Sequence, residues 1–183
     1  MGAALARRLD EDPDFEYVAG LDTRPPSGDV GRTEFIDADI RDPAIAAVVP
    51  ELAVDTLVHN QIVRRPGAGM SSATMHDVNV IGSLQLLTAC EKAPQVRNIV
   101  VRGSAGIYGA EPQAPQFFTE DMDRVYPLRT RFQRDVAEIE TLFATFARRH
   151  PEGVCPMLRS QPAIGTSLDT QVARYLSLPV APT

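Results

Sequence analysis

Two aspartates follow short apolar stretches of the sequence, at positions where β-strands would end. Asp22 closes the stretch 15–22, twenty positions after Gly2. An acid about 20 residues beyond a glycine-rich turn hydrogen-bonds the ribose of a dinucleotide and favours NAD over NADP. Gly2 is the only glycine of such a turn present here, so an ordinary strand-end turn before Arg24 explains Asp22 equally well.

Asp39 and Ile40 follow the next apolar stretch, residues 33–40. A carboxylate beside a backbone N–H can read the edge of an adenine ring at the carboxyl end of a strand. The neighbouring Asp42 precedes Pro43, which is the pattern of a helix N-cap followed by proline at the first helical position. Ligand binding and helix capping would use different residues here, so both interpretations can hold together.

Asn79 and Ser104 are polar residues in otherwise apolar surroundings. Asn79 shares a predicted helix face with Met75, Gly82 and Leu86, and a buried amide needs hydrogen-bond partners. It is either a brace of a cofactor site, acting through backbone or water contacts, or a satisfied core amide. Ser104 follows a predicted buried strand, where ligands of parallel sheets bind; the alternative is an ordinary loop serine.

Helix and strand patterns alternate along the chain and position these residues. Strands are predicted at 15–22, 33–40, 54–60, 97–104 and 154–159, and helices at 2–11, 43–49, 72–93, 131–150 and 169–178. This alternation predicts an α/β fold in one domain, a Rossmann-like, doubly wound parallel sheet covered on both faces. Such a sheet begins with its central strand, whereas this pattern begins with a helix, so we expect the first strand to be missing.

The composition excludes several classes of function. The 183 residues carry 18 basic and 24 acidic side chains, a net charge of −6, and only 6% aromatic residues. These values argue against nucleic acid or an anionic membrane as a partner. We expect no spanning helix, no secretory signal and no metal site, because long apolar runs and zinc-like Cys/His spacings are absent from the sequence. Two cysteines make no disulfide framework, so a cytoplasmic location is expected.

Taken in order, the motifs resemble the extended short-chain dehydrogenase/reductases, specifically the NAD-dependent epimerase/dehydratase group that acts on sugar nucleotides. Residues 2–9 are similar to the end of that family's glycine turn and to its first helix. The other matching segments are Asp22, Asp39-Ile40, Val58-His59-Asn60, Asn79 to Ser83, Ser104 to Gly109, Leu158-Arg159 and Ile164-Gly165.

The resemblance implies a Rossmann-like domain that binds NAD, with NADP less favoured, and a nucleotide-sugar substrate. The cofactor-binding residues it implies are Gly2, Asp22, Asp39, Ile40, Asn60 and Asn79. Ser104 matches the catalytic hydroxyl and would be its remnant. The family often dimerises through two long helices, here 72–93 and 131–150, so a homodimer is expected.

The departures from the family pattern concern the reaction itself. The family's catalytic Tyr-x-x-x-Lys pair aligns with Phe132 and Val136, which lie on an apolar stripe that continues to Phe146. The Asn after the last strand is Pro162, and the chain stops about where the substrate lobe would be completed. Three interpretations remain open: an oxidoreductase or epimerase relative with weakened or no catalysis, a non-catalytic dinucleotide-binding or interaction module, and a truncated fragment of a longer enzyme.

Overall fold

The computed structural model describes residues 2–65, 67, 69–109, 111–112, 114, 117–161, 174–175 and 177–178. Within these ranges the strands are β1 (Ala19–Asp22), β2 (Glu34–Asp37), β3 (Thr56–His59), β4 (Asn98–Ser104) and β5 (Met157–Ser160). The α-helices are α1 (Gly2–Asp10), α2 (Ile45–Glu51), α3 (Ser72–His76), α4 (Gly82–Glu91) and α5 (Arg131–Arg149). A π-helical turn, Asp77–Ile81, joins α3 to α4, and a 3-10 helix, Ala105–Tyr108, follows β4.

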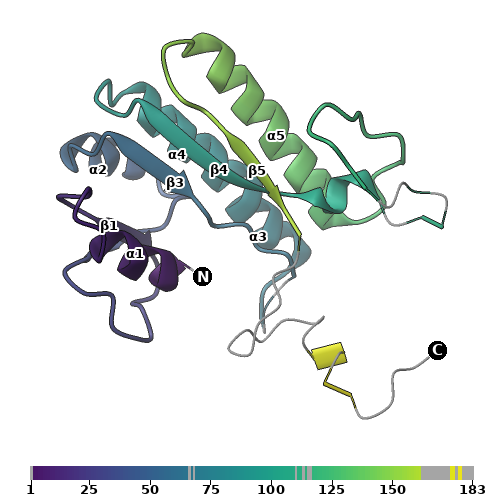
Figure 1. Cartoon of the computed structure of the whole chain (residues 1–183), viewed down its shortest axis with the longest axis horizontal. Helices are drawn as coiled ribbons and strands as arrows, with labels where there is room; N and C mark the ends of the chain where they lie inside the picture. Colours follow the sequence, from purple (N-terminus) through teal and green to yellow (C-terminus); the bar gives the residue numbers. More distant parts are fainter. Residues whose placement is uncertain are drawn as a thin grey trace.

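The strands form two separate parallel sheets (Figure 1). β1 pairs with β2, and β4 lies between β3 and β5. In the doubly wound order, one strand separates the strands that correspond here to β1 and β3. No strand of the described residues occupies that place, so the prediction of an α/β fold without its first strand is confirmed.

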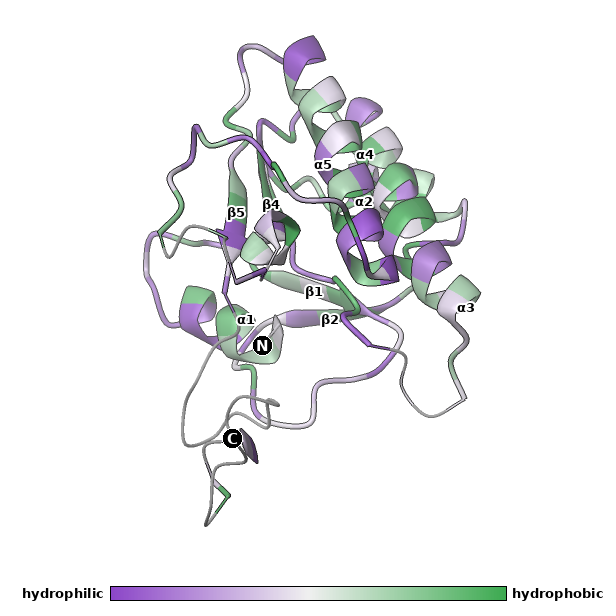
Figure 2. Cartoon of the chain, turned by 90° about the vertical axis from the view of Figure 1, so that its right-hand side faces the viewer, coloured by the Kyte–Doolittle hydropathy of each residue, from purple (hydrophilic) through white to green (hydrophobic). Residues whose placement is uncertain are grey.

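The helices α2, α4 and α5 lie on one side of the three-stranded sheet (Figures 1 and 2). On the opposite face, Val58 is 39% exposed and Leu158 is 55% exposed. Parallel sheets are ordinarily buried on both faces. The expectation that this sheet is covered on both faces is therefore wrong for the residues described, because their long helices all pack on the same side.

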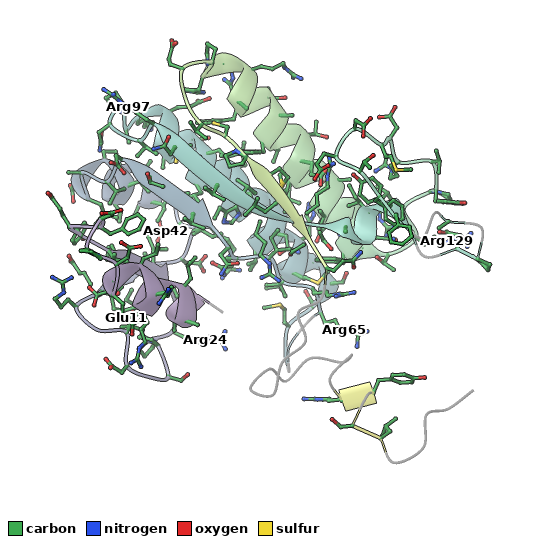
Figure 3. All side chains as sticks on the ribbon, viewed as in Figure 1. Glu11, Arg24, Asp42, Arg65, Arg97 and Arg129 are labelled. Carbon is green, nitrogen blue, oxygen red and sulfur yellow. The ribbon has the colours of Figure 1, made fainter. Side chains whose placement is uncertain are left out.

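The two edges of the larger sheet differ in their side chains. The exposed Arg97 precedes β4 at the amino edge, far from Arg65 in the loop after β3 (Figure 3). At the carboxyl edge, β4 ends in Ser104 and β5 ends in Ser160. Ser104, a candidate from the sequence, therefore lies beside Ser160 at the carboxyl edge, where a doubly wound sheet binds its ligands.

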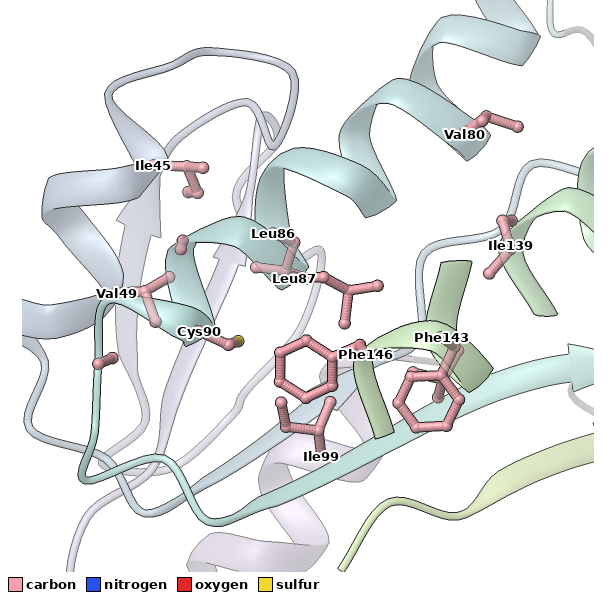
Figure 4. Close-up of a cluster of buried hydrophobic side chains, with 13 residues drawn as sticks. Ile45, Val49, Val80, Leu86, Leu87, Cys90, Ile99, Ile139, Phe143 and Phe146 are labelled. Atoms are coloured by element: carbon pink, nitrogen blue, oxygen red, sulfur yellow. The ribbon is translucent and has the colours of Figure 1, made fainter. Parts of the chain in front are cut away.

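The core lies between this sheet and its helices (Figure 4). Ile99 and Val101 of β4 face Phe143 and Phe146 of α5, and all four are buried. Buried residues recur along α5 at the three-to-four-residue spacing of an amphipathic helix. The apolar stripe predicted from residue 132 onward thus forms the packing face of α5.

The helix predicted over 72–93 is present but interrupted by the π-helical turn. Ser71 caps it, since its side chain accepts a hydrogen bond from the Thr74 backbone N–H at 3.0 Å. The helix expected over 169–178 lies mostly outside the described residues, as do Pro162 and Ile164-Gly165. Within the part of the chain that the structure describes, no helix combines the length and apolar character needed to cross a membrane.

Candidate functional site

Ser104 forms the corner between β4 and the 3-10 helix. Its Oγ accepts a hydrogen bond from the Gly106 N–H at 3.2 Å, which caps that helix. Gly109 ends the turn with a φ of +89°, and a Cβ there would lie 2.3 Å from the Glu111 carboxylate. The Ser-x-x-x-Tyr-Gly sequence thus has a structural reason at both ends, a helix cap and a left-handed residue.

Tyr108, the tyrosine of that motif, has its hydroxyl occupied. It accepts a hydrogen bond from Arg159 Nη1 at 2.8 Å, and its ring stacks on Phe118 with 4.6 Å between centroids. Arg159 is also paired with Glu140 at 3.0 Å, and hydrogen bonds to Glu140 raise the pKa of its guanidinium. Tyr108 therefore joins the turn to β5 and α5.

The two positions predicted to align with the catalytic tyrosine and lysine of the family, Phe132 and Val136, have hydrocarbon side chains. Val136 is completely buried against Ile107 and Tyr108. Phe132 is half-buried, and its ring carries the Arg64 guanidinium 5.7 Å above the centroid. This face of α5 therefore has no hydroxyl or ammonium group that could exchange a proton with a sugar.

The start of α5 is tied to the Ser104 turn. Thr130 and Gln133 form a capping box, with Thr130 Oγ1 accepting from the Gln133 N–H at 3.1 Å. The Gln133 side chain also donates to the Gly106 carbonyl oxygen at 2.9 Å. Phe132 is consequently held beside the carboxyl edge of β4.

Asn79 is fully buried and uses its amide within the protein. Its Oδ1 accepts from the Val63 N–H at 2.7 Å, and its Nδ2 donates to the Val63 carbonyl oxygen at 2.9 Å and to Asp135 Oδ2 at 3.1 Å. It therefore fixes the backbone of the loop after β3. The role of Asn79 in cofactor binding stays a prediction, and Asn79 would contribute to it by fixing the loop after β3.

Asp135 is a buried acid that the sequence reasoning missed. Its side chain is 1% exposed, its Oδ1 lies 2.9 Å from His76 Nδ1, and Arg131 Nε lies 3.0 Å from the same oxygen. His76 is half-buried against this carboxylate. The only sign in the sequence that Asp135 is buried is its position next to Val136, within the apolar stripe of α5.

His59 is buried at the end of β3. Its Nε2 lies 2.7 Å from Ser83 Oγ, and the Ser83 hydroxyl in turn donates to the Asn79 carbonyl oxygen. Burial lowers the pKa of His59 to about 4. The imidazole is therefore neutral at ordinary pH and links β3 to α4.

Asn60, the next residue, reaches across the carboxyl edge of the sheet. Its Oδ1 accepts a hydrogen bond from Arg102 Nη1 at 3.3 Å, and Arg102 Nε donates to Ser160 Oγ at 3.4 Å. One half-buried arginine on β4 thus connects the ends of β3 and β5. No pattern in the sequence indicated this role for Arg102.

The predicted adenosine residues lie on the smaller sheet. Asp22 and Asp37 are register partners at the carboxyl ends of β1 and β2, so Asp22 and Asp39 lie close together in the fold. Asp22 Oδ1 accepts from the Arg24 N–H at 3.1 Å. The Arg41 guanidinium bonds to both oxygens of Asp39 and lowers the pKa of that carboxyl.

Asp39 lines an open hollow of about 510 Å³ that Asp42, Asp77 and Ile81 also line. The Ile40 side chain is buried rather than open to this hollow. Gly2 begins α1 with open space around its Cα. Among the described residues, no group of three His, Cys, Asp or Glu side chains is arranged to hold a metal ion.

Two parallel sheets in this order, with polar side chains collected at their carboxyl ends, define the Rossmann-like class of α/β proteins. The chain belongs to the NAD-dependent epimerase/dehydratase family, whose sequence model matches residues 1–170. An uncharacterized protein of Mycobacterium tuberculosis is 37% identical over the whole chain, which corresponds to 50% of that relative. The chain thus spans about half the length of the curated relatives it matches.

The fold is also similar to those of solved UDP-glucose 4-epimerases. A UDP-glucose 4-epimerase from Stenotrophomonas maltophila with bound NAD and formylated UDP-arabinopyranose is 26% identical, with a TM-score of 0.64 over 80% of this chain and 46% of that one. A UDP-glucose 4-epimerase from Thermotoga maritima with UDP-glucose has a TM-score of 0.70 over 86% of this chain and 51% of that one, at 22% identity. The second likeness supports the fold alone.

Proposed function

We propose that this chain is the dinucleotide-binding part of a nucleotide-sugar oxidoreductase or epimerase relative, and that it has lost the tyrosine-lysine reaction. The observation that carries the proposal is the pairing of β1 with β2, which brings Asp22 and Asp39 to one edge. The open hollow lined by Asp39, Arg41 and Ile81 leaves room for a ligand beside this edge. NAD-bound relatives of the same fold support NAD as the cofactor.

Asp22 would hold the adenosine ribose. Its Oδ1 already accepts the Arg24 N–H, while no described residue bonds to its Oδ2. A carboxylate with one free oxygen can accept a ribose hydroxyl hydrogen and would repel a 2′-phosphate. We therefore infer a preference for NAD over NADP.

Asp39 and Ile40 would contact the adenine. The Asp39 carboxylate has about four lone-pair directions, so pairing with Arg41 leaves acceptor capacity toward the hollow. Ile40 packs beneath the site, against Gly82. Gly2 would face the pyrophosphate from the start of α1, and Asn60 and Asn79 would hold the loop beside the nicotinamide end.

NAD supplies the hydride acceptor of the family's reaction, and the protein must supply a base for the sugar hydroxyl proton. Phe132 has no proton to exchange, and the loss of a general base typically costs 10²–10⁴-fold in rate. Ser104 can position a hydroxyl but already serves as a helix cap. We therefore expect no turnover in a UDP-glucose epimerase assay with added NAD. Robust turnover that survives Ser104→Ala would contradict both the inactivity and the role assigned to Ser104.

Calorimetric titration of NAD and NADP tests the cofactor assignment. Wild-type chain is expected to bind NAD more tightly, and Asp22→Asn should remove most of that difference. The matched control is Asp14→Asn, which makes the same charge change at an exposed turn. Equal or tighter NADP binding by the wild type would refute the role of Asp22.

We also propose that the chain forms a homodimer through the helices of residues 72–93 and 131–150. Leu84, a large apolar residue on α4, is 45% exposed. Sedimentation should show a dimer that Leu84→Glu disrupts. Leu158→Glu, on the opposite side of the sheet, is the control and should leave the dimer intact.

A further inference from the structure

A small hollow at the carboxyl ends of β4 and β5 is lined by two arginines and two serines. Arg64, Arg102, Ser104 and Ser160 face it, together with Ile62, Gly103, Phe132 and Gln161. Its volume is about 40 Å³, and a cavity needs roughly 10–15 Å³ to hold one water. The space suits one charged headgroup rather than a whole nucleotide.

Arg102 is a half-buried cation whose hydrogen-bond partners, Ser160 and Asn60, are neutral. Its guanidinium donates to Ser160 Oγ and Asn60 Oδ1, at the long distances of 3.4 and 3.3 Å. No carboxylate of the described residues lies within ion-pair distance of it. Arg159, which precedes Ser160 on β5, shows the contrast, because it forms an ion pair with Glu140.

Arg64 brings a second positive charge to the same hollow. It lies over the Phe132 ring at 5.7 Å, within the range of a cation–π interaction, and no described acid pairs with it. Two guanidiniums in one small space repel each other unless an anion lies between them. Phe132, which is predicted to stand where the family has its catalytic tyrosine, makes this cation–π contact with Arg64.

The Ser104 hydroxyl completes the set of donors, whereas the Ser160 hydroxyl already donates to the Gly103 carbonyl oxygen at 3.3 Å. Ser104 Oγ accepts from the Gly106 N–H, so its own hydrogen is available to a ligand. Guanidinium and hydroxyl groups together match the oxygens of a phosphoryl or carboxylate group. We propose that this hollow binds one oxyanion of a ligand, a sugar phosphate or a sugar acid, between Arg102 and Arg64.

The inference goes beyond the proposed function and does not need it, because the anion is tested without NAD. Glucose 1-phosphate and glucuronate are titrated into the full chain by calorimetry, with glucose as the neutral probe. We expect at least one anion to bind and glucose not to bind. Binding of glucose 1-phosphate alone assigns a phosphoryl group, and binding of glucuronate alone assigns a carboxylate.

Arg102→Gln is expected to weaken anion binding at least tenfold, as the loss of a charged hydrogen-bond donor does. Arg97→Gln is the matched control, since it removes the same charge at the amino end of the same strand (Figure 3). Arg64→Gln, at an exposed loop position, decides the result if Arg102→Gln does not fold. Absence of anion binding by the wild type, affinities unchanged in the folded site variants, or an equal loss in Arg97→Gln would each overturn the proposal.

Discussion

Gly82→Ala tests whether the glycine after the π-helical turn serves packing. A Cβ at residue 82 would lie 2.6 Å from both Cδ1 and Cγ1 of Ile40, whereas carbon atoms prefer about 3.5–4.0 Å. Overpacking of this kind costs about 1–3 kcal/mol. Replacing glycine by alanine in a helix returns up to about 1 kcal/mol. Because the contact is so short, we expect a net loss of about 1–2 kcal/mol.

The assay is urea and thermal unfolding followed by circular dichroism. For a chain of this size the loss corresponds to a fall in Tm of roughly 2–8 °C. Ile40→Ala removes both clashing atoms, so the double variant should be more stable than the sum of the single effects predicts. Gly2→Ala is the control, since nothing lies within 4 Å of its added Cβ. If Gly82→Ala is as stable as wild type, or if Ile40→Ala gives no relief, the packing argument fails.

The remaining predictions concern pH and the gap in the sheet. The pKa of His59 is about 4 in the fold against an ordinary 6.5, so the unfolded chain binds the proton first. Stability should fall by up to about 3 kcal/mol between pH 6.5 and 4, and His59→Gln should flatten that part of the curve; equal slopes would contradict this. An apolar strand of about five residues and a Gly-x-x-Gly turn, joined ahead of Gly2, should pair with β1 and β3. We expect higher Tm and tighter NAD binding than with a scrambled segment of the same composition, and equal values would refute it.

Periodicity predicted the helices well because their packing faces are local in sequence. The long helix predicted at 131–150 is Arg131–Arg149 in the structure. The strands were overestimated, since a strand extends only as far as its partner. Residues 15–22 were predicted as a strand, but β1 is Ala19–Asp22 because β2 begins at Glu34.

The site was harder to predict because its contacts join distant parts of the chain. Asp135 meets His76 across 59 residues, and Arg102 meets Ser160 across 58. No periodic pattern reports such pairs. Asp22 and Asp39, the residues predicted to bind adenosine, could be singled out from local patterns, because they lie at or just after the ends of β1 and β2.

Three of the residues that match the family pattern have a structural role in this fold. Ser104 caps a helix, Gly109 requires a positive φ, and Asn79 satisfies the loop after β3. Each of these three residues stabilises the local backbone, so their presence does not imply catalytic activity. In the proposed function, Phe132 and Val136 decide between a proton-transfer site and a binding site, and they are a phenyl ring beneath Arg64 and a buried valine. We therefore propose that this edge of the sheet recognises a ligand by charge and supplies no acid–base group.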